Sequence, residues 1–440
     1  MGNRHGTGDP CALKWRVGRP GFATLTAFIW LLCCASVWAK LTMLATEPDW
    51  RLLDRYQNTI TRAELESRLR LYSPDGSIYQ YLALDDGAVR VYSDKEKQNQ
   101  LWELHLADSD REKQPWPPPE KPLLIRKLAG ATPEKPLQGL RICLDPGHIG
   151  GDWSDIEERK FRIGQGPVVE EGELNYTTCQ LMEPLLKEAG AEVVWTRQLG
   201  IPATPLRPEN LQAEGVQMMW LRDAKKAQRL GPAGLIKLAK WYSELLFYRV
   251  AEIRARATTV SELKPDLTLC IHYNAAAWGR RPRLMRVNKI VIFVHGSYLP
   301  SELEFDDMKF VLFNKLLERT SGVEQRVADS IADRVTQVWN YAPENYENSP
   351  EGASRAGTSP YVWSRNLLAN RLFPGPVVFV EGPYMNDRDA YPRIIAGDYE
   401  GERDIGGKKY RSVFREYAEI VANAVIDYYR KSLENDPPGR

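Results

Sequence analysis

Three side chains suited to metal chemistry stand just beyond short apolar runs of the sequence. His148 follows a run that ends at residue 144, and His272 and Glu381 each directly follow another. In open α/β sheets, ligand sites lie beyond the carboxyl ends of the strands. If the three runs are parallel strands of one sheet, these side chains meet at one edge of it. Each has an ordinary structural explanation when taken singly, and it is their coincidence that indicates a functional site.

Two imidazoles and one carboxylate make up a ligand set of catalytic zinc sites, which keep a fourth position open. The carboxylate would come from the pair Glu170-Glu171, which stands just before a predicted helix. A single negative ligand leaves net positive charge on the metal, so that the pKa of bound water falls toward about 7. A second carboxylate, free of the metal, could then move the proton. The pattern predicts one Zn²⁺ per chain, because magnesium and calcium prefer oxygen ligands.

The elements that would position these residues follow an α/β pattern. From residue 140 onward, short apolar runs alternate with amphipathic helices, which predicts a mostly parallel or mixed sheet flanked by helices. We expect strands at residues 141–144, 192–196, 267–271, 289–294 and 377–380. We expect helices at residues 173–190, 323–338 and 413–428, the second with five β-branched residues on one face.

A small α+β domain is expected on the N-terminal side of this α/β region, and the sequence does not indicate its role. Thr61 to Glu64 is a capping box, residues 79–84 and 88–92 flank a hairpin turn, and Trp102 opens another strand whose His105 faces solvent. Seven prolines follow between residues 115 and 136, which indicates a stiff linker. The expected parts are a leader at 1–39, the small domain at 47–110, the linker at 111–139, and a catalytic domain at 140–431 with a helical insertion at about 200–250.

The leader has the pattern of an export signal. No charged residue occurs between Gly21 and Ala39, and basic residues precede this stretch. Val37 and Ala39 are small side chains at the positions that signal cleavage requires. The apolar stretch is also close to the length that spans a bilayer, so an uncleaved membrane anchor is the alternative. Both interpretations predict an exported protein of the periplasm or cell envelope.

The overall composition excludes some classes of partner. The chain has 440 residues, of which 59 are Lys or Arg and 58 are Asp or Glu, so its formal net charge is +1. This balance gives no support to a nucleic-acid partner. No pair of its six cysteines has the spacing of a zinc finger.

Four blocks of sequence resemble the zinc-dependent N-acetylmuramoyl-L-alanine amidases of the type-3 class. They are residues 144–151, 171–175, 271–275 and 380–387, and the resemblance covers about residues 140–431. It implies that His148, Glu171 and His272 bind zinc and that Glu381 is the catalytic acid/base. Asn274, in the third block, and Arg371, just before the last strand, are candidates for substrate binding.

The sequence departs from this family at three places. The gap between His148 and Glu171 is long, and Glu170 could compete as ligand. The spacing to Leu174-Asn175 favours Glu171. The fourth block has Gly-Pro-Tyr at residues 382–384, where the family has Leu-Gly-Phe. The insertion at 200–250 is either extra packing on the flank of the sheet or a lid over the zinc, on which an activator protein could act.

The implied activity is hydrolysis of the amide between N-acetylmuramic acid and the L-alanine of the peptidoglycan stem peptide, in wall remodelling or daughter-cell separation. A zinc hydrolase of another envelope amide or peptide is one alternative. A catalytically silent wall-binding or regulatory protein is the other. The expected partner is peptidoglycan, and a membrane is expected only through an uncleaved leader. We expect His295 to support the structure or a metal ligand, and not to bind the metal itself.

Overall fold

The computed structural model describes residues 40–115, 130–347 and 349–435. The predicted leader and residues 116–129 of the predicted linker lie outside the described residues. Among the helices of the described part, none combines the length and apolar character that a membrane span needs.

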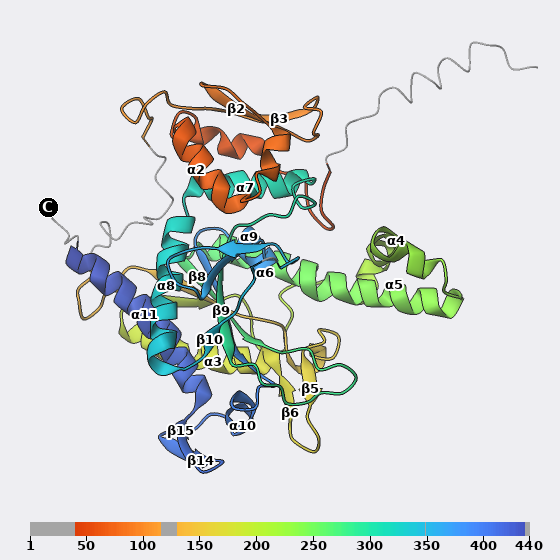
Figure 1. Ribbon diagram of the computed structural model, residues 1–440, viewed down its shortest axis with the longest axis vertical. Helices are drawn as coiled ribbons and strands as arrows, with labels where there is room; N and C mark the ends of the chain where they lie inside the picture. The colour runs from red at the N-terminus through yellow and green to blue at the C-terminus, as the bar shows by residue number, and fades with distance from the viewer. Residues whose placement is uncertain (1–39, 116–129, 348, 436–440) are drawn as a thin grey trace, which may run out of the picture. The chain divides into compact units, whose positions relative to one another are not determined.

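The described residues contain a central sheet of eight strands (Figure 1). Along the sheet the order is β11-β12-β9-β13-β8-β4-β7, with β10 beside β9. Most neighbours are parallel, whereas β13 runs antiparallel to β9 and β11 antiparallel to β12. The mixed α/β sheet predicted from the sequence is confirmed. The strands are β4 (Arg141–Pro146), β7 (Glu192–Trp195), β8 (Leu267–Asn274), β9 (Lys289–Val294), β10 (Ala342–Pro343), β11 (Ala353–Arg355), β12 (Val362–Arg365) and β13 (Val377–Tyr384).

Helices cover both faces of this sheet. One face packs on α3 (Glu171–Glu188), α8 (Ser321–Val338) and α11 (Val413–Asn435) in the largest apolar cluster. The other packs on α6 (Glu252–Leu263) and α9 (Leu368–Leu372). Because side chains alternate along a strand, Ile142 and Leu144 face the first set of helices while Cys143 faces the second. Both faces are buried, which is why these strands read as continuous apolar runs.

The N-terminal part forms a three-stranded antiparallel sheet with short helices. Its elements are η1 (Trp50–Tyr56), α2 (Arg62–Tyr72), η2 (Ser77–Tyr81), β1 (Leu82–Leu84), β2 (Ala88–Tyr92) and β3 (Gln100–His105). The capping box of Thr61 and Glu64 is present, and His105 is exposed as predicted. Residues 79–81, expected in a strand, belong instead to the short helix η2. The core of this part continues into α7 (Asp306–Glu318), so the two share one apolar cluster.

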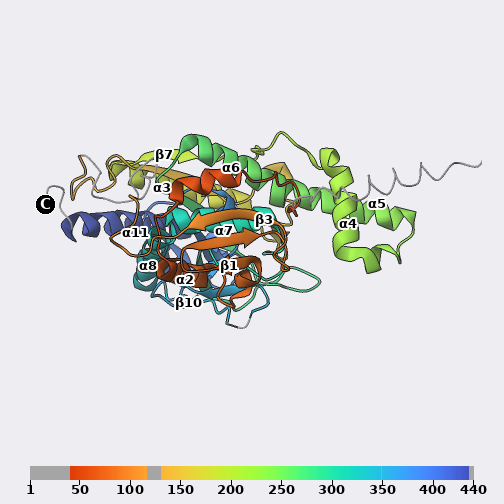
Figure 2. The same ribbon diagram turned by 90° about the horizontal axis from the view of Figure 1, so that it is seen from above.

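The insertion is a helical hairpin followed by a bend. Helices α4 (Gln212–Ala227) and α5 (Pro232–Leu246) lie side by side and extend away from the central sheet (Figure 2). A short helix, η5 (Pro208–Leu211), precedes α4, and the π-helical turn η6 (Phe247–Ala251) joins α5 to α6. Leu238 and Tyr242 of the apolar stripe of α5 are buried against Met219 and Ala227 of α4. Leu246, at the end of the stripe, packs instead with Ile149 and Leu211.

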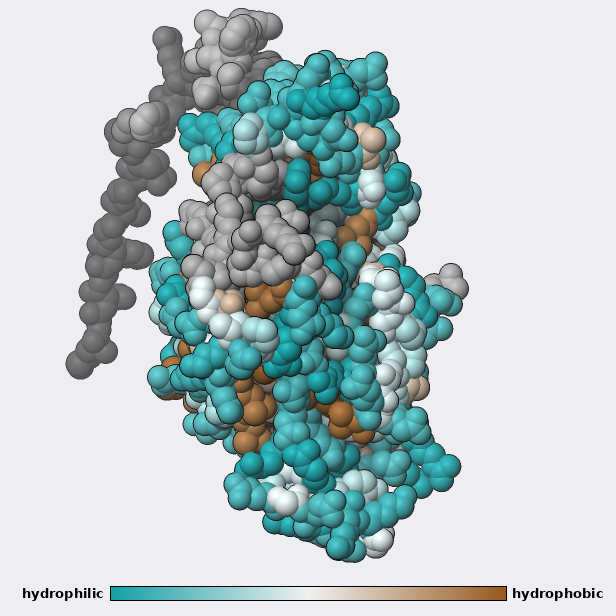
Figure 3. Space-filling model, turned by 90° about the vertical axis from the view of Figure 1, so that its left-hand side faces the viewer, coloured by the Kyte–Doolittle hydropathy of each residue, from teal (hydrophilic) through white to brown (hydrophobic). Residues whose placement is uncertain are grey.

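Several short elements were not predicted from the sequence. They are the hairpins β5 (Lys160–Arg162) with β6 (Val168–Glu170) and β14 (Glu402–Ile405) with β15 (Lys408–Arg411), and the short helices η4 (Gly151–Trp153) and α10 (Ala390–Ile395). The molecular face in Figure 3 is covered mainly by hydrophilic residues, with small separate apolar patches. The large apolar clusters of the described residues are formed by buried side chains of the sheet and its helices.

Candidate metal centre and active site

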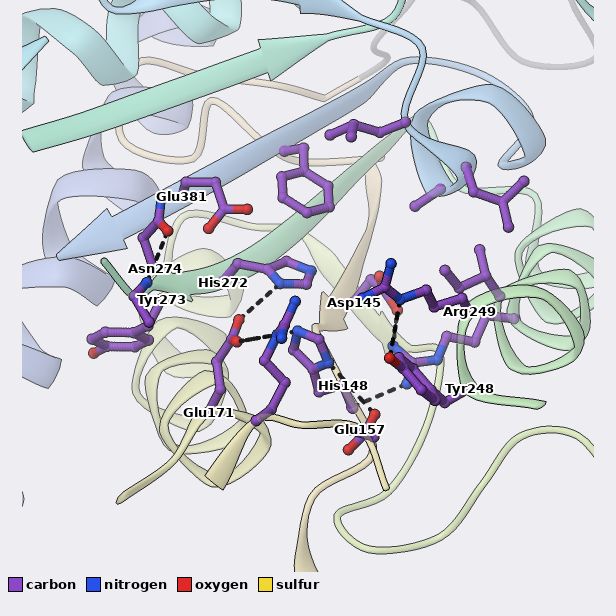
Figure 4. A pocket seen from close by; sticks show the side chains of 18 residues that line it. Asp145, His148, Glu157, Glu171, Tyr248, Arg249, His272, Tyr273, Asn274 and Glu381 are labelled. Carbon is purple, nitrogen blue, oxygen red and sulfur yellow. Dashed lines mark hydrogen bonds and ion pairs between the residues drawn. The ribbon is translucent and has the colours of Figure 1, made fainter. Parts of the chain in front are cut away.

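The four residues singled out by the sequence converge at the carboxyl ends of β4, β8 and β13. These strands are adjacent and parallel, and Glu381 on β13 pairs in register with His272 on β8. His148 follows the end of β4, and Glu171 opens α3. Figure 4 shows His148, Glu171 and His272 pointing toward one another, with Glu381 nearby.

His148 occupies an unusual backbone conformation. Its φ of 59° lies in the left-handed region, which a residue with a side chain adopts only when its surroundings hold it there. Arg256 Nη2 donates to the His148 carbonyl at 3.0 Å. The Glu157 carboxylate accepts hydrogen bonds from the backbone N–H groups of Ile149 and Gly150, and one of its oxygens lies 3.5 Å from His148 Nδ1. These contacts direct the other ring nitrogen, Nε2, toward Glu171 Oε2 at 3.2 Å.

The structure distinguishes the two adjacent glutamates. Glu171 places Oε1 3.1 Å from His272 Nδ1, and its backbone N–H donates to the Arg159 carbonyl. Glu170 points elsewhere: Ser154 donates to it at 2.7 Å, and Lys160 lies 3.3 Å away. Of the pair, only Glu171 is available to the two histidines.

His148, Glu171 and His272 form a group that could hold a metal ion. One ligand atom from each lies within 4.8 Å of the others. The set of two imidazoles and one carboxylate suits zinc. His272 stacks on Phe379, with ring centroids 4.2 Å apart. A Cβ on Gly147 would lie 2.1 Å from His272 Cε1, so that only glycine leaves room for this ring.

The electrostatics of the three side chains favour a cation among them. Burial would raise the pKa of Glu171, but His148 and His272 outweigh burial and hold it well below its ordinary value. Burial would lower the pKa of His148, yet Glu171 and Glu157 raise it to about 9. For His272 burial dominates, and its pKa is lowered. The ionised Glu171 carboxylate lies between the two imidazoles, and a metal bound there would displace the proton that His148 otherwise carries.

Glu381 has a different environment from Glu171. Burial, together with the nearby charge of Glu171, raises the pKa of Glu381 to about 8. A carboxyl whose pKa lies near neutrality can both accept and release a proton under ordinary conditions. The two carboxylates are therefore differentiated, with one held ionised among imidazoles and the other suited to proton transfer.

A buried network of charges supports the loop that carries His148. Arg256 lies 3.2 Å from an Asp145 oxygen and 2.9 Å from a Glu252 oxygen. Thr196 also donates to Asp145, at 2.5 Å, and Arg197 donates to the carbonyls of Pro146 and Gly147. Thr196, Arg197 and Arg256, which make these contacts, all stand far from His148 in the sequence.

The pocket around the four residues has a volume of about 370 Å³. Tyr248 and Arg249, from η6, and Ile253, from α6, line it, so the insertion contributes to the wall only after its hairpin has ended. The predicted residue Asn274 lines the pocket. Arg371 is not among the lining residues; it is buried on α9 and donates to Asn366.

The departure at residues 382–384 has a packing explanation. A Cβ at Gly382 would lie 2.5 Å from the ring of Tyr417 on α11. The Tyr417 hydroxyl lies 3.0 Å from the carbonyl oxygens of both His272 and Val380. Tyr417 therefore ties β8 to β13 next to the site, and glycine is required to admit it. His295 lies apart from the site, fully buried, with Nε2 3.0 Å from the Tyr298 hydroxyl.

Of three comparisons with known proteins, only the one with solved structures finds similar proteins. No family model matches it, and no curated protein matches it. Among solved structures, it is similar to the N-acetylmuramyl-L-alanine amidase Ami1 from Mycobacterium abscessus, with 14% identity over 66% of this chain and 99% of that one and a TM-score of 0.35. It is also similar to the amidase AmiC2 of Nostoc punctiforme, with 15% identity over 66% and 98% and a TM-score of 0.34. A third similar structure is the CwlD amidase from Clostridioides difficile, solved with the GerS lipoprotein. It shows 14% identity over 68% of this chain and 100% of that one, with a TM-score of 0.33.

Proposed function

We propose that this protein is a zinc-dependent N-acetylmuramoyl-L-alanine amidase, which hydrolyses the amide between N-acetylmuramic acid and the L-alanine of the stem peptide. The observation that carries the proposal is the convergence of His148, Glu171, His272 and Glu381 in one pocket. Hydrolysis of an unactivated amide needs an activated water, a polarised carbonyl and a group that protonates the leaving nitrogen. The four residues can supply all three. The resemblance of the four sequence blocks names the bond.

His148, Glu171 and His272 would hold the metal, which supplies Lewis acidity toward the carbonyl and lowers the pKa of a bound water when present. Glu381 accepts the proton of the attacking water and later delivers it to the departing amine nitrogen. Glu157 and Arg256 keep His148 in place through the contacts described above. We assign Asn274 to substrate binding because it lines the pocket.

The proposed site of action is the cell envelope, where the substrate occurs. This rests on the export pattern of residues 1–39 and on peptidoglycan as the substrate. Wall remodelling or daughter-cell separation would be the corresponding role.

Mass spectrometry of purified wall digested with the protein tests the proposal. The expected products are free stem peptides that begin with L-alanine, together with glycan chains bearing intact lactyl groups. Glu381→Gln protein, which is expected to keep the fold because the two side chains have nearly the same size, serves as the matched control and should release none. Peptides with another amino terminus would instead identify a different envelope amide. Failure to release any product with metal-loaded protein would favour a binding protein.

A further inference from the structure

Two further hollows follow one another next to the candidate active site, and together they are called the groove below. A second hollow, of about 420 Å³, shares Arg159 and Ala275 with the catalytic pocket. Its walls include Phe161 of β5 and Trp278, whose ring centroids lie 5.1 Å apart, together with Met385. Glu158 and Arg159 also line this hollow, so its walls combine apolar side chains with one acidic and one basic group.

A third hollow, of about 540 Å³, follows next to the second and is strongly basic. It is lined by Ile163, Pro282, Arg283, Leu284, Met285, Arg286 and Arg388. The second and third hollows adjoin each other, because the residues that line them are close together on two sides. On one wall, Phe161 and Ile163 are two residues apart. On the other, the Met285 N–H donates at 2.7 Å to the carbonyl of Asn386, the residue after Met385.

The loop that carries these arginines is firmly held. Asn386 accepts a hydrogen bond from the Ala276 N–H at 2.9 Å and donates to the Ala276 carbonyl at 2.8 Å. The Asp387 carboxylate accepts from the Val287 N–H at 2.9 Å, and Arg388 N–H donates to the Met285 carbonyl. The loop is thus clamped at its start and its end. Rigid support of this kind is what a binding surface needs in order to hold charged side chains in place.

The arginines of the third hollow have no acidic partners. Arg283, Arg286 and Arg388 are exposed, and none forms an ion pair with a carboxylate in the part of the chain that the structure describes. Arg280 and Arg281 on the same loop are also exposed and also lack such a partner there. A cluster of like charges is disfavoured by mutual repulsion, and an anionic ligand would relieve this repulsion. The guanidinium group is well suited to binding carboxylates through paired hydrogen bonds.

We propose that this groove receives the peptide arm of the substrate, and that Arg283, Arg286 and Arg388 bind carboxylates on that arm. This inference rests on the proposed function. Of the two sides of the scissile amide, the glycan side carries hydroxyl and N-acetyl groups, whereas the peptide side carries the free carboxylates of acidic residues and of its carboxyl terminus. Charge therefore assigns the peptide to the basic groove. The apolar side chains of the groove contact the aliphatic side chains of the peptide on the way.

The test compares two muramyl peptides, one with free carboxylates on its peptide arm and one in which those groups are amidated. The parent protein should cleave the free form with a kcat/KM about 30-fold higher, from about threefold for each exposed ion pair. The difference should lie mainly in KM, because the contacts are remote from the reacting bond. Raising the ionic strength should reduce the difference.

The triple variant R283A/R286A/R388A should cleave both peptides at the rate at which the parent cleaves the amidated one. Arg281→Ala, on the same loop but not lining the groove, is the matched control and should keep the full preference. The triple lysine variant keeps the charge and should recover part of the preference. Equal cleavage of both peptides by the parent protein would overturn the inference while leaving the amidase proposal intact. A triple variant that still prefers the free form, or that loses the same factor on both peptides, would also overturn it. If the parent cleaves neither peptide, it is the proposed function that fails.

Discussion

Two glutamates in one pocket are given different tasks by their surroundings. Glu171 lies between two imidazoles that hold its pKa low, whereas burial and the charge of Glu171 raise the pKa of Glu381 to about 8. A carboxylate that stays ionised suits a metal, and one that titrates near neutrality suits proton transfer. The geometry agrees with this division, since only Glu171 contacts both histidines.

This division predicts opposite outcomes for the two glutamine substitutions. Glu381→Gln should keep about one zinc per chain and lose about 10²- to 10⁴-fold in activity, the usual contribution of a general acid or base. Glu171→Gln should weaken metal binding, and His148→Ala or His272→Ala should abolish it together with activity. Metal analysis and turnover on a muramyl peptide check both. Loss of zinc in Glu381→Gln with retention in Glu171→Gln would reverse the assignment.

Gly147 is expected to be essential for the metal site because of the space it leaves. A Cβ there would lie 2.1 Å from His272 Cε1, so that Gly147→Ala must displace the imidazole ring. We expect the variant to fold but to bind zinc at least about tenfold more weakly, a small displacement of a ligand being costly to the coordination geometry. Gly231→Ala is the control, since its Cβ would meet nothing within 4 Å. Titration with zinc measures both, and unchanged affinity in Gly147→Ala would contradict this account.

At the scale of single residues, the sequence could identify the chemistry but not its support. His148, His272 and Glu381 stand at the ends of apolar runs, a pattern visible without a structure. Glu157 and Arg256 could not be found in this way. Arg256 approaches the His148 carbonyl across 108 positions of sequence, and no local pattern records such a contact.

At the scale of elements, strands with an apolar run were predictable and the others were not. The five predicted strands coincide with β4, β7, β8, β9 and β13, and all but the edge strand β7 are buried along most of their length and therefore apolar. The strand β12 is buried too, but it has only four residues, two of them polar, and was not predicted. Hairpin β5–β6 has strands of three residues with charged side chains, so it has no such signature. The stripe on α5 was predicted as an amphipathic helix, but its partners were not: Leu238 and Tyr242 pack on α4, and Leu246 packs with Ile149, next to His148.

The α4–α5 contact depends on Gly215. A Cβ there would lie 2.3 Å from Ser243 Oγ and 2.9 Å from the Ala239 carbonyl oxygen. Gly215→Val should therefore separate the helices, at a cost of about 1–3 kcal/mol to the hairpin. Limited proteolysis should show faster cleavage within residues 212–246, with zinc binding unchanged because the hairpin lines no part of the pocket. Ala213→Val, on the exposed side of α4, should cleave like the parent protein. Equal resistance of both variants would show that the close approach is unimportant.

At the scale of the whole molecule, the N-terminal part and the α/β layer are joined by a common core. Leu312, Phe313 and Leu316 of α7 are almost fully buried, in the same cluster as residues of α2 and β3. The rings of Phe313 and Trp102 lie 5.9 Å apart. The sequence indicated a small domain before a linker, but the apolar pattern of α7 gave no sign of what would cover it. A helix's apolar face reports that it is buried, not against which segment.

The shared core predicts that the two parts unfold together. Phe313→Ala should lower the free energy of unfolding by about 3–5 kcal/mol, the usual cost of removing a buried phenyl ring. Tryptophan fluorescence and loss of zinc should report one transition at the same denaturant concentration. Phe310→Ala, whose side chain is only partly buried in the same cluster, should cost less. Two separate transitions in the parent protein would show that the N-terminal part folds by itself.

The last prediction concerns the catalytic part without its N-terminal neighbour. Removal of residues 1–115 would uncover the apolar side of α7, including Leu312 and Phe313, and would also remove the hydrogen bonds that Lys40 and Thr42 make to Asp306 and Asp307. An exposed apolar face of this kind promotes aggregation. We expect the shortened protein to be less soluble and to melt at a clearly lower temperature, whereas removal of residues 1–39 alone leaves these contacts in place. Size-exclusion chromatography and thermal unfolding of the two shortened proteins distinguish the outcomes. A monomeric fragment that starts at residue 116 and keeps the thermal midpoint and zinc affinity of the longer protein would contradict the shared core as a source of stability.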